Sequence, residues 1–313
     1  MIEVQNLCRY FGETKAVDNI SFNVEKGEVL GFLGPNGAGK STTMKVITGF
    51  ISPTSGTVRI LGHDIEQDSI EAKKKVGYLA ENAPLYGEMK VGEFLAFVAD
   101  VRGYEGAHKF QAVERVYDLT GIGSVAKQTI DTLSKGFKRR VGLSQALIHD
   151  PDILILDEPT DGLDPNQKYE VRTLINKMAR DKCIILSTHI LEEVDEVCNR
   201  VAIIANGKLV ADETPAKLKA RSRAAGALSV SFEGNAPENV LTELAKISGV
   251  ARVEEISKKK SNAVYLLYAQ NNAVILPAVT EELTKRQWPY ASVGLEQGYL
   301  DEVFRTLTNT GRN

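Results

Sequence analysis

The chain has 313 residues, of which 25% are charged and 43% hydrophobic, and its formal net charge is −3. This length allows about two domains with a substantial core, and the small net charge excludes a uniformly basic nucleic-acid-binding surface. No apolar run approaches the roughly 20 residues that span a bilayer, and the opening segment MIEVQNL lacks a signal-peptide pattern. The three cysteines lack metal-ligand spacing, so we expect reduced thiols in a cytoplasmic protein.

Short apolar segments, turns and helical patterns alternate in the first two thirds of the chain. The first expected strands are residues 1–7, 20–24, 29–33 and 56–62. Residues 152–157 (DILILD) and 183–188 (CIILST) are almost wholly apolar, which is typical of strands buried on both faces of a parallel sheet. Asn206-Gly207 predicts a hairpin turn. Residues from about 90 to 149 lack a strand pattern and predict an inserted helical subdomain.

A change in composition at residues 219–226 indicates a linker, so we expect domains at 1–220 and 221–313. Beyond the linker, the patterns follow the order βαββαβ, which is typical of a ferredoxin-like domain. The expected strands are 227–232, 251–256, 263–268 and 290–295, and the expected helices are 237–247 and 273–286. A lysine-rich turn at 257–262 separates the second and third strands, and a short helix at 300–307 follows the last one.

A glycine-rich loop, GFLGPNGAGKSTT, lies between an expected strand and an expected helix. Its glycines allow the backbone to wrap closely around phosphate oxygens, and the helix N-terminus adds its dipole. In this motif the lysine reaches the β and γ phosphates and the following serine coordinates Mg²⁺. The predicted nucleotide-binding residues are Gly34, Asn36, Gly37, Ala38, Gly39, Lys40, Ser41 and Thr42.

Two adjacent carboxylates, Asp157 and Glu158, end the apolar strand DILILD. Because they repel each other at a buried strand end, a cation is expected beside them. Mg²⁺ bound to a nucleotide supplies that cation, with Asp157 as its ligand and Glu158 free to polarise an attacking water. The alternative is a solvated acidic loop.

His189 directly follows the next apolar strand, CIILST. A single histidine is more often structural than catalytic. However, parallel strands place their carboxyl ends at the same sheet edge, so His189 is expected near the γ-phosphate if the two strands are neighbours.

The segment TLSKGFKRR (132–140) places four basic residues at the start of an expected helix. Cations are disfavoured there by the helix dipole. Either the side chains of Lys135, Lys138, Arg139 and Arg140 point into water, or an anion lies beside them.

Taken together, these motifs resemble those of the ATP-binding subunits of ABC transporters. They are GPNGAGKST (Walker A), GYLAE (Q-loop), LSKGF (signature), ILILDEP (Walker B), DGLD (D-loop) and STH (switch histidine), in that order. The resemblance covers about residues 1–215. It implies an α/β P-loop NTPase fold with a RecA-like core, an antiparallel β subdomain and a helical subdomain. It further implies an ATPase that works as a dimer around two ATP molecules, either a homodimer of this chain or a pair of cassettes.

The resemblance also implies roles for individual residues. Phe11, with Tyr10 as its rival, would stack on adenine, and Val17 would flank the base. Ser134 and Gly136 would contact the γ-phosphate held by the opposite subunit, and Asp164 would couple the two sites. Glu158 and His189 would be catalytic, and Ser41, Asp157 and Glu81 would meet Mg²⁺ or the attacking water.

Two motifs depart from the family pattern. Lys135 and Phe137 stand where the signature LSGGQ has a glycine and the glutamine, and Glu81 stands where the Q-loop has glutamine. Lys135 either adds a charge to the phosphate contact or faces solvent.

Segments 82–103 (NAPLYGEMKVGEFLAFVADVRG) and 300–308 (LDEVFRTLT) resemble the ABC-2 export-type branch. This resemblance implies integral membrane permease subunits as partners, a location on the cytoplasmic face of the membrane, and no nucleic acid. The alternative is a soluble ABC ATPase that acts on nucleic acid or ribosomes. The repair members of that class carry a long coiled coil between Walker A and signature, and this chain has no room for one.

Overall fold

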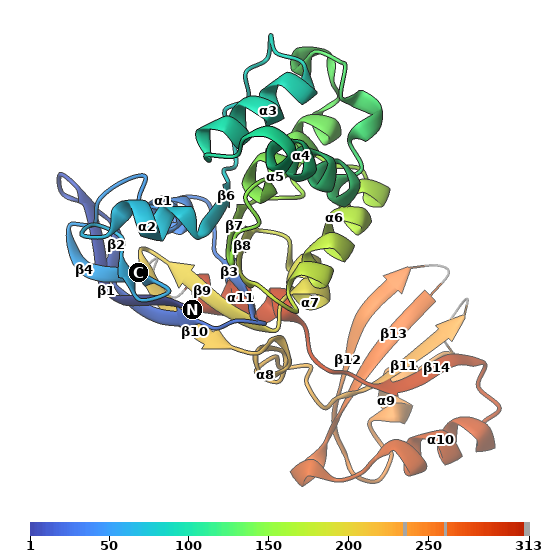
Figure 1. The fold of residues 1–313 in the computed structure, drawn as a ribbon. Helices are drawn as coiled ribbons and strands as arrows, with labels where there is room; N and C mark the ends of the chain where they lie inside the picture. The colour runs from blue at the N-terminus through green and yellow to red at the C-terminus, as the bar shows by residue number, and fades with distance from the viewer. Residues whose placement is uncertain (234–236, 260–261, 310–313) are drawn as a thin grey trace. The chain divides into compact units, whose positions relative to one another are not determined.

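The computed structural model describes residues 1–233, 237–259 and 262–309. Its internal contacts divide the chain into two compact units, Met1–Pro215 with the segment from Arg305, and Ala216–Phe304. The sequence had placed everything after residue 220 in one domain. The difference arises in helix α11 (Leu300–Asn309), which begins in the second unit and ends in the first (Figure 1). Within the described ranges, no helix has the length and apolar character that crossing a membrane requires.

A six-stranded sheet with the order β10-β9-β3-β8-β7-β6 forms the centre of the first unit. Its strands are β3 (Val29–Leu33), β6 (Val76–Leu79), β7 (Ile153–Asp157), β8 (Cys183–Thr188), β9 (Arg200–Ala205) and β10 (Lys208–Glu213). All pair in parallel except β10, which forms a hairpin with β9. Every residue of β3, β7 and β8 is buried, as their apolar sequences predict. Since β7 and β8 are neighbours, their carboxyl ends meet at one edge.

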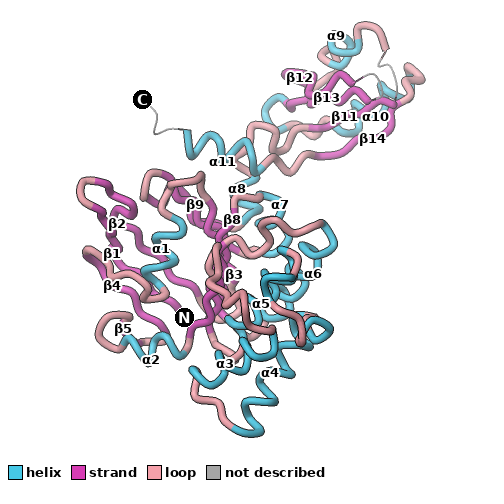
Figure 2. Tube along the Cα trace, turned by 90° about the horizontal axis from the view of Figure 1, so that it is seen from above, coloured by secondary structure: helices cyan, strands magenta, loops and turns pink. Residues whose placement is uncertain are grey.

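A second, antiparallel sheet has the order β2-β1-β4-β5. Its strands are β1 (Ile2–Phe11), β2 (Thr14–Val24), β4 (Ser55–Ile60) and β5 (His63–Asp64). Helix α1 (Lys40–Ile47) lies between the two sheets (Figure 2), and its Met44, Val46 and Ile47 are fully buried in their common core. The rings of Phe22 and Phe32 also join the sheets, with centroids 5.6 Å apart. This packing fixes the loop before α1 at the edge where the parallel strands end.

Helices make up most of the chain between β6 and β7. They are α3 (Val91–Val101), α4 (Gly106–Thr120), the short η1 (Gly123–Val125) and η2 (Ile130–Thr132), and α5 (Lys135–Leu147). The other helices of this unit are α2 (Ser69–Lys74), α6 (Pro165–Met178), α7 (Leu191–Val197) and the start of α8 (Pro215–Lys219). The α/β class expected from the sequence is confirmed.

The second unit has the expected order βαββαβ. Its elements are β11 (Leu228–Glu233), α9 (Val240–Leu244), β12 (Val250–Lys259), β13 (Asn262–Ala269), η3 (Gln270–Asn272), α10 (Leu276–Lys285) and β14 (Tyr290–Leu295). The sheet order is β12-β13-β11-β14, and all neighbours pair antiparallel. Phe232, Val279 and Leu283 belong to a core between this sheet and its helices. Residues 260–261 of the lysine-rich turn lie outside the described residues.

The hairpin turn at Asn206-Gly207 is hydrogen-bonded to the glycine-rich loop. Both residues have positive φ, 50° and 77°, as a primed turn requires. The Gly207 amide donates to the Ala38 carbonyl at 3.0 Å, and its carbonyl accepts from the Asp18 amide at 2.8 Å. The turn therefore links β2 to the loop.

Gly207→Ala should lower the free energy of unfolding by about 1–2 kcal/mol, the usual cost of a left-handed residue with a Cβ. The added Cβ would also lie only 3.0 Å from the Lys15 carbonyl oxygen. Urea denaturation followed by circular dichroism measures the change. Asn206→Gly, which relieves positive φ at the neighbouring position, is the matched control and should not destabilise the fold. Equal stability of Gly207→Ala and the wild type would contradict this role of the turn.

Candidate nucleotide-binding site

The glycine-rich loop holds its lysine in a buried, pre-formed position. Gly39 has φ 110°, and a Cβ there would lie 2.3 Å from the Ala16 carbonyl oxygen. This position therefore has no space for a side chain. The Lys40 ammonium donates to the carbonyls of Gly34 at 2.7 Å and Pro35 at 3.3 Å. Burial lowers the pKa of Lys40, and the carboxylates of Glu158, Asp157 and Glu81 oppose that shift. The loop thus holds a cation where an anion would bind.

A cavity of about 390 Å³ opens in front of this loop. From the predicted site, Asn36, Gly37, Gly39, Lys40, Ser41, Thr42, Glu81, Glu158 and His189 line it. Ala16 and Asp161, which the sequence had not singled out, line it as well. Among the described residues, the lining includes none of Ser134, Lys135, Gly136 and Asp164. Residues about 150 positions apart along the chain are therefore brought together. Of the D-loop DGLD, which the structure describes in full, only its first residue, Asp161, is part of the lining, and the three signature residues are not.

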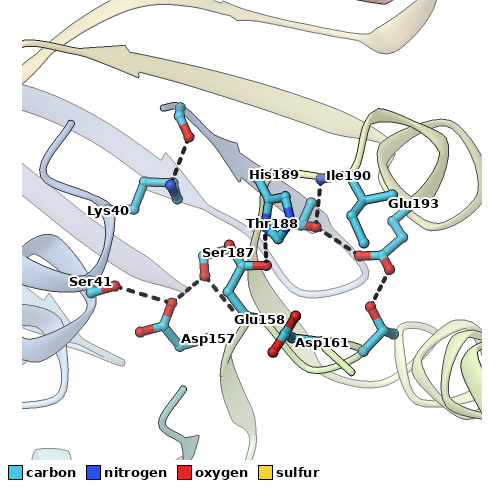
Figure 3. Close-up of polar contacts among 12 residues, drawn as sticks. Lys40, Ser41, Asp157, Glu158, Asp161, Ser187, Thr188, His189, Ile190 and Glu193 are labelled. Atoms are coloured by element: carbon cyan, nitrogen blue, oxygen red, sulfur yellow. Dashed lines mark hydrogen bonds and ion pairs between the residues drawn. The ribbon is translucent and has the colours of Figure 1, made fainter. Parts of the chain in front are cut away.

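Asp157 is almost fully buried, at 1% exposure, and faces two hydroxyl groups. The Ser187 hydroxyl donates to its Oδ1, and the Ser41 hydroxyl donates to the same oxygen at 3.5 Å (Figure 3). A serine hydroxyl beside a carboxylate fits Mg²⁺, which binds one or two protein oxygens and takes its other ligands from phosphates and water. The described residues contain no cluster of three or more His, Cys, Asp or Glu that could hold a metal alone. These residues fit a magnesium ion that arrives with a nucleotide.

Glu158 forms a hydrogen-bonded pair with His189 across the ends of β7 and β8. His189 Nδ1 and Glu158 Oε2 are 2.9 Å apart (Figure 3). Burial raises the pKa of Glu158, and the hydrogen bond to His189 opposes that rise. Glu158 also has φ 51°, and its amide donates to both the carbonyl and the hydroxyl of Ser187. A buried carboxylate with a raised pKa at a cavity wall is suited to accept a proton.

The basic residues at the start of α5 have partners in their own chain. Lys135 pairs with Asp161 at 3.1 Å, Lys138 with Asp131 at 3.4 Å, and Arg140 with Glu170. The Ser134 hydroxyl caps the helix by accepting from the Phe137 amide at 3.4 Å. The Lys135 side chain is 67% exposed, and its ion-pair partner, Asp161, lies at the cavity wall. A contact between Lys135 and a phosphate stays a prediction.

Arg139, one of the basic residues at the start of α5, connects two loops of the site through partners that the sequence did not indicate. Its guanidinium donates to five backbone carbonyls, those of Ala80, Glu81, Asp157, Glu158 and Pro159. Burial lowers its pKa, and the nearby carboxylates, Asp157 first, oppose that shift. Arg139 therefore ties the Q-loop to the Walker B loop. A basic residue in a helix carries no sequence signal for carbonyl partners, so only the fold reveals this role.

Gly136 and Asp164 have structural functions within the chain. A Cβ at Gly136 would lie 2.3 Å from Gln167 Oε1, so α5 packs closely on the first turn of α6. The Asp164 carboxylate caps α6 by accepting from the Gln167 amide at 3.0 Å. The expected roles of these residues across a dimer stay predictions.

The residues expected near the base differ in their exposure. Phe11 is 48% exposed, with the Arg9 guanidinium 4.5 Å from its ring centroid. Tyr10 instead donates its hydroxyl to Asp18 at 3.1 Å. Val17 is fully buried in the core, and its neighbour Ala16 lines the cavity. Ala16 rather than Val17 thus presents surface there.

A glycine-rich loop after a buried parallel strand, a buried lysine and a carboxylate pair on the neighbouring strand end define a P-loop nucleotide-binding protein. The family model described as ABC transporter matches residues 17–161. The chain is 37% identical over 225 residues to the bacitracin transport ATP-binding protein BcrA of Bacillus licheniformis, covering 71% of this chain and 72% of that protein. The chain therefore belongs to the ATP-binding proteins of ABC transporters, a family of ATP hydrolases.

Other comparisons agree with this assignment. The probable multidrug ABC transporter ATP-binding protein YbhF of Escherichia coli is 41% identical over 223 residues, which cover 71% of this chain but only 38% of that protein. The linearmycin resistance ATP-binding protein LnrL of Bacillus subtilis is 29% identical over 98% of both chains. The dimeric structure of MJ0796, a bacterial ABC transporter cassette, superimposes with a TM-score of 0.63 and 25% identity, covering 68% of this chain and 98% of that one.

His189→Ala should raise the pKa of Glu158 further. The histidine hydrogen bond lowers that pKa against the effect of burial, so its loss leaves burial less opposed. Carboxyl carbon NMR of selectively labelled Glu158, followed through a pH titration, should show a midpoint above the ordinary glutamate value in the wild type. The midpoint should be higher still in His189→Ala. A midpoint that falls in the variant would show that the two side chains are not paired.

Proposed function

We propose that this chain is the Mg²⁺-dependent ATPase subunit of an ABC exporter, and that two copies close around two ATP molecules to drive membrane permease subunits. The observation that carries the proposal is the incomplete cavity. It contains the loop, the lysine and the Glu158–His189 pair, whereas the signature residues Ser134 to Gly136 lie outside its lining. A second copy would supply them. The dimeric MJ0796 cassette supports this arrangement.

The residues on the cavity wall have complementary roles in hydrolysis. Lys40 and the loop amides would bind the β and γ phosphates, and Ser41 and Asp157 would hold Mg²⁺, which supplies charge stabilisation on the phosphates. Glu158 would polarise the attacking water, a contribution worth about 10²- to 10⁴-fold in rate. His189 would keep Glu158 oriented and ionised through the 2.9 Å hydrogen bond.

The loop after β6 would connect this site to the permease. Glu81 lines the cavity, and Arg139 holds its carbonyl at 2.7 Å. A few residues further on, Tyr86 is 58% exposed and packs edge-on against Phe97, itself 42% exposed. Exposed aromatic side chains are enriched at protein interfaces. We therefore place the permease contact at these residues and the subunit at the cytoplasmic face of the membrane.

The direction of transport and the cargo class rest on the relatives. YbhF is named as a probable multidrug transporter protein and LnrL as a resistance protein. Another relative, from Paraburkholderia xenovorans, is a Nod factor export protein. These names favour export. Co-purification of the chain with an integral membrane partner tests the role in a transporter, and recovery with ribosomes or DNA instead would overturn it.

Glu158→Gln should bind ATP normally but turn it over at least about 100-fold more slowly, because the water loses its base while Lys40 and the loop are unchanged. The ATP-bound dimer should then accumulate, as seen by size-exclusion chromatography with light scattering. Lys40→Ala is the comparison variant, since it should lose nucleotide binding and stay monomeric. Normal turnover by Glu158→Gln would contradict its role as the base.

A further inference from the structure

Glu193 is a buried acid behind the catalytic pair that the mechanism above does not use. It lies in the first turn of α7 and is only 1% exposed. Burying a carboxylate is costly unless hydrogen bonds replace its water. Both of its oxygens have such partners: Thr160 Oγ1 donates to Oε1, and Thr188 Oγ1 donates to Oε2 at 2.8 Å (Figure 3).

The two threonines lie close in sequence to Glu158 and His189, which both line the cavity. Thr188 ends β8 and directly precedes His189, and Thr160 follows Glu158 by two residues. Both threonines are buried, at 0% and 2% exposure. The Thr188 hydroxyl also accepts from the Ile190 amide at 3.0 Å, so it holds the backbone on the far side of His189.

Glu193 therefore links the loop that carries Glu158 to the loop that carries His189. The 2.9 Å contact between those side chains depends on the separation of the two loops. Glu158 also has φ 51°, a conformation that persists only where the surroundings hold it. Glu193 itself is absent from the residues that line the cavity, so it would act through its neighbours.

A carboxylate is the one side chain of this size that satisfies both threonines. Each hydroxyl donates, so two acceptor oxygens are needed. Glutamine has the same shape but only one acceptor oxygen, so its amide group would donate to one threonine hydroxyl and the proton of that hydroxyl would lose its carboxylate acceptor. An unsatisfied buried donor would then push one of the loops away.

We propose that Glu193 is a positioning residue for ATP hydrolysis, which clamps Thr160 and Thr188 and so sets the distance between Glu158 and His189. This inference rests on the catalytic roles proposed above for that pair.

Glu193→Gln tests it by steady-state kinetics. We expect kcat to fall about 10- to 100-fold, the usual effect of a misplacement of about 1 Å at a catalytic group. The KM for ATP should change less than about twofold, because Lys40 and its loop are untouched. Glu192→Gln, which removes an exposed charge from the same helix, is the matched control and should behave as wild type. Thr188→Val should resemble Glu193→Gln, and Thr188→Ser, which keeps the hydroxyl, should recover the lost activity.

The outcomes separate this inference from the proposed function. Wild-type kcat in Glu193→Gln, with turnover lost in Glu158→Gln, would overturn the role of Glu193 alone. A fall in kcat that only follows the folded fraction, measured by thermal unfolding, would also overturn it. Normal turnover by Glu158→Gln would overturn the proposed function and this inference with it. A selective fall in kcat with unchanged melting would support both.

Discussion

The structure of the site depends on the burial of two adjacent carboxylates, Asp157 and Glu158, at the end of β7. Buried charges of one sign repel each other and cannot be left unpaired. Hydroxyl groups of Ser41 and Ser187 face Asp157, His189 faces Glu158, and the Lys40 ammonium lies close enough to both carboxylates that they affect its pKa. The groups that offset the burial of the two carboxylates belong to the glycine-rich loop with the start of α1, and to β8 with the residue after it. These segments therefore have to meet at one edge of the sheet.

The side chains of Arg139 and Glu193 connect the loops that meet at that edge of the sheet. Arg139 binds the carbonyls of Asp157 and Glu158 and those of the loop after β6, and Glu193 binds the threonines beside Glu158 and His189. Arg139 lies in α5 and Glu193 in α7, so a movement of either helix would change the surroundings of Glu158 and His189. This arrangement gives a physical route by which contact with another protein could alter hydrolysis.

The sequence predicted the parts of this fold that depend on local pattern. Apolar runs predicted β7 and β8, and the glycine-rich segment predicted the loop before α1, because burial and positive φ each restrict the residue types that a position accepts. Through the rule that parallel strands end at one edge, the sequence also placed His189 at the same edge as Asp157 and Glu158, although the hydrogen bond between His189 and Glu158 is visible only in the structure. It did not predict the partners of Arg139, which are backbone carbonyls, or the buried state of Glu193, which reads as one acid among several in LEEVDE. Val17 was placed at the base by resemblance, but the strand register points it into the core.

Mixing two inactive variants tests whether each active site is assembled from two copies of the chain, as we propose. Lys40→Ala disables the phosphate loop, and Ser134→Arg disables the signature. If the sites form across a dimer, a mixed dimer contains one intact site, made of the loop of one variant and the signature of the other. We expect ATP turnover by the mixture to exceed the summed turnover of the separate variants. A mixture no more active than that sum, with mixed dimers demonstrated by tagged pull-down, would contradict it.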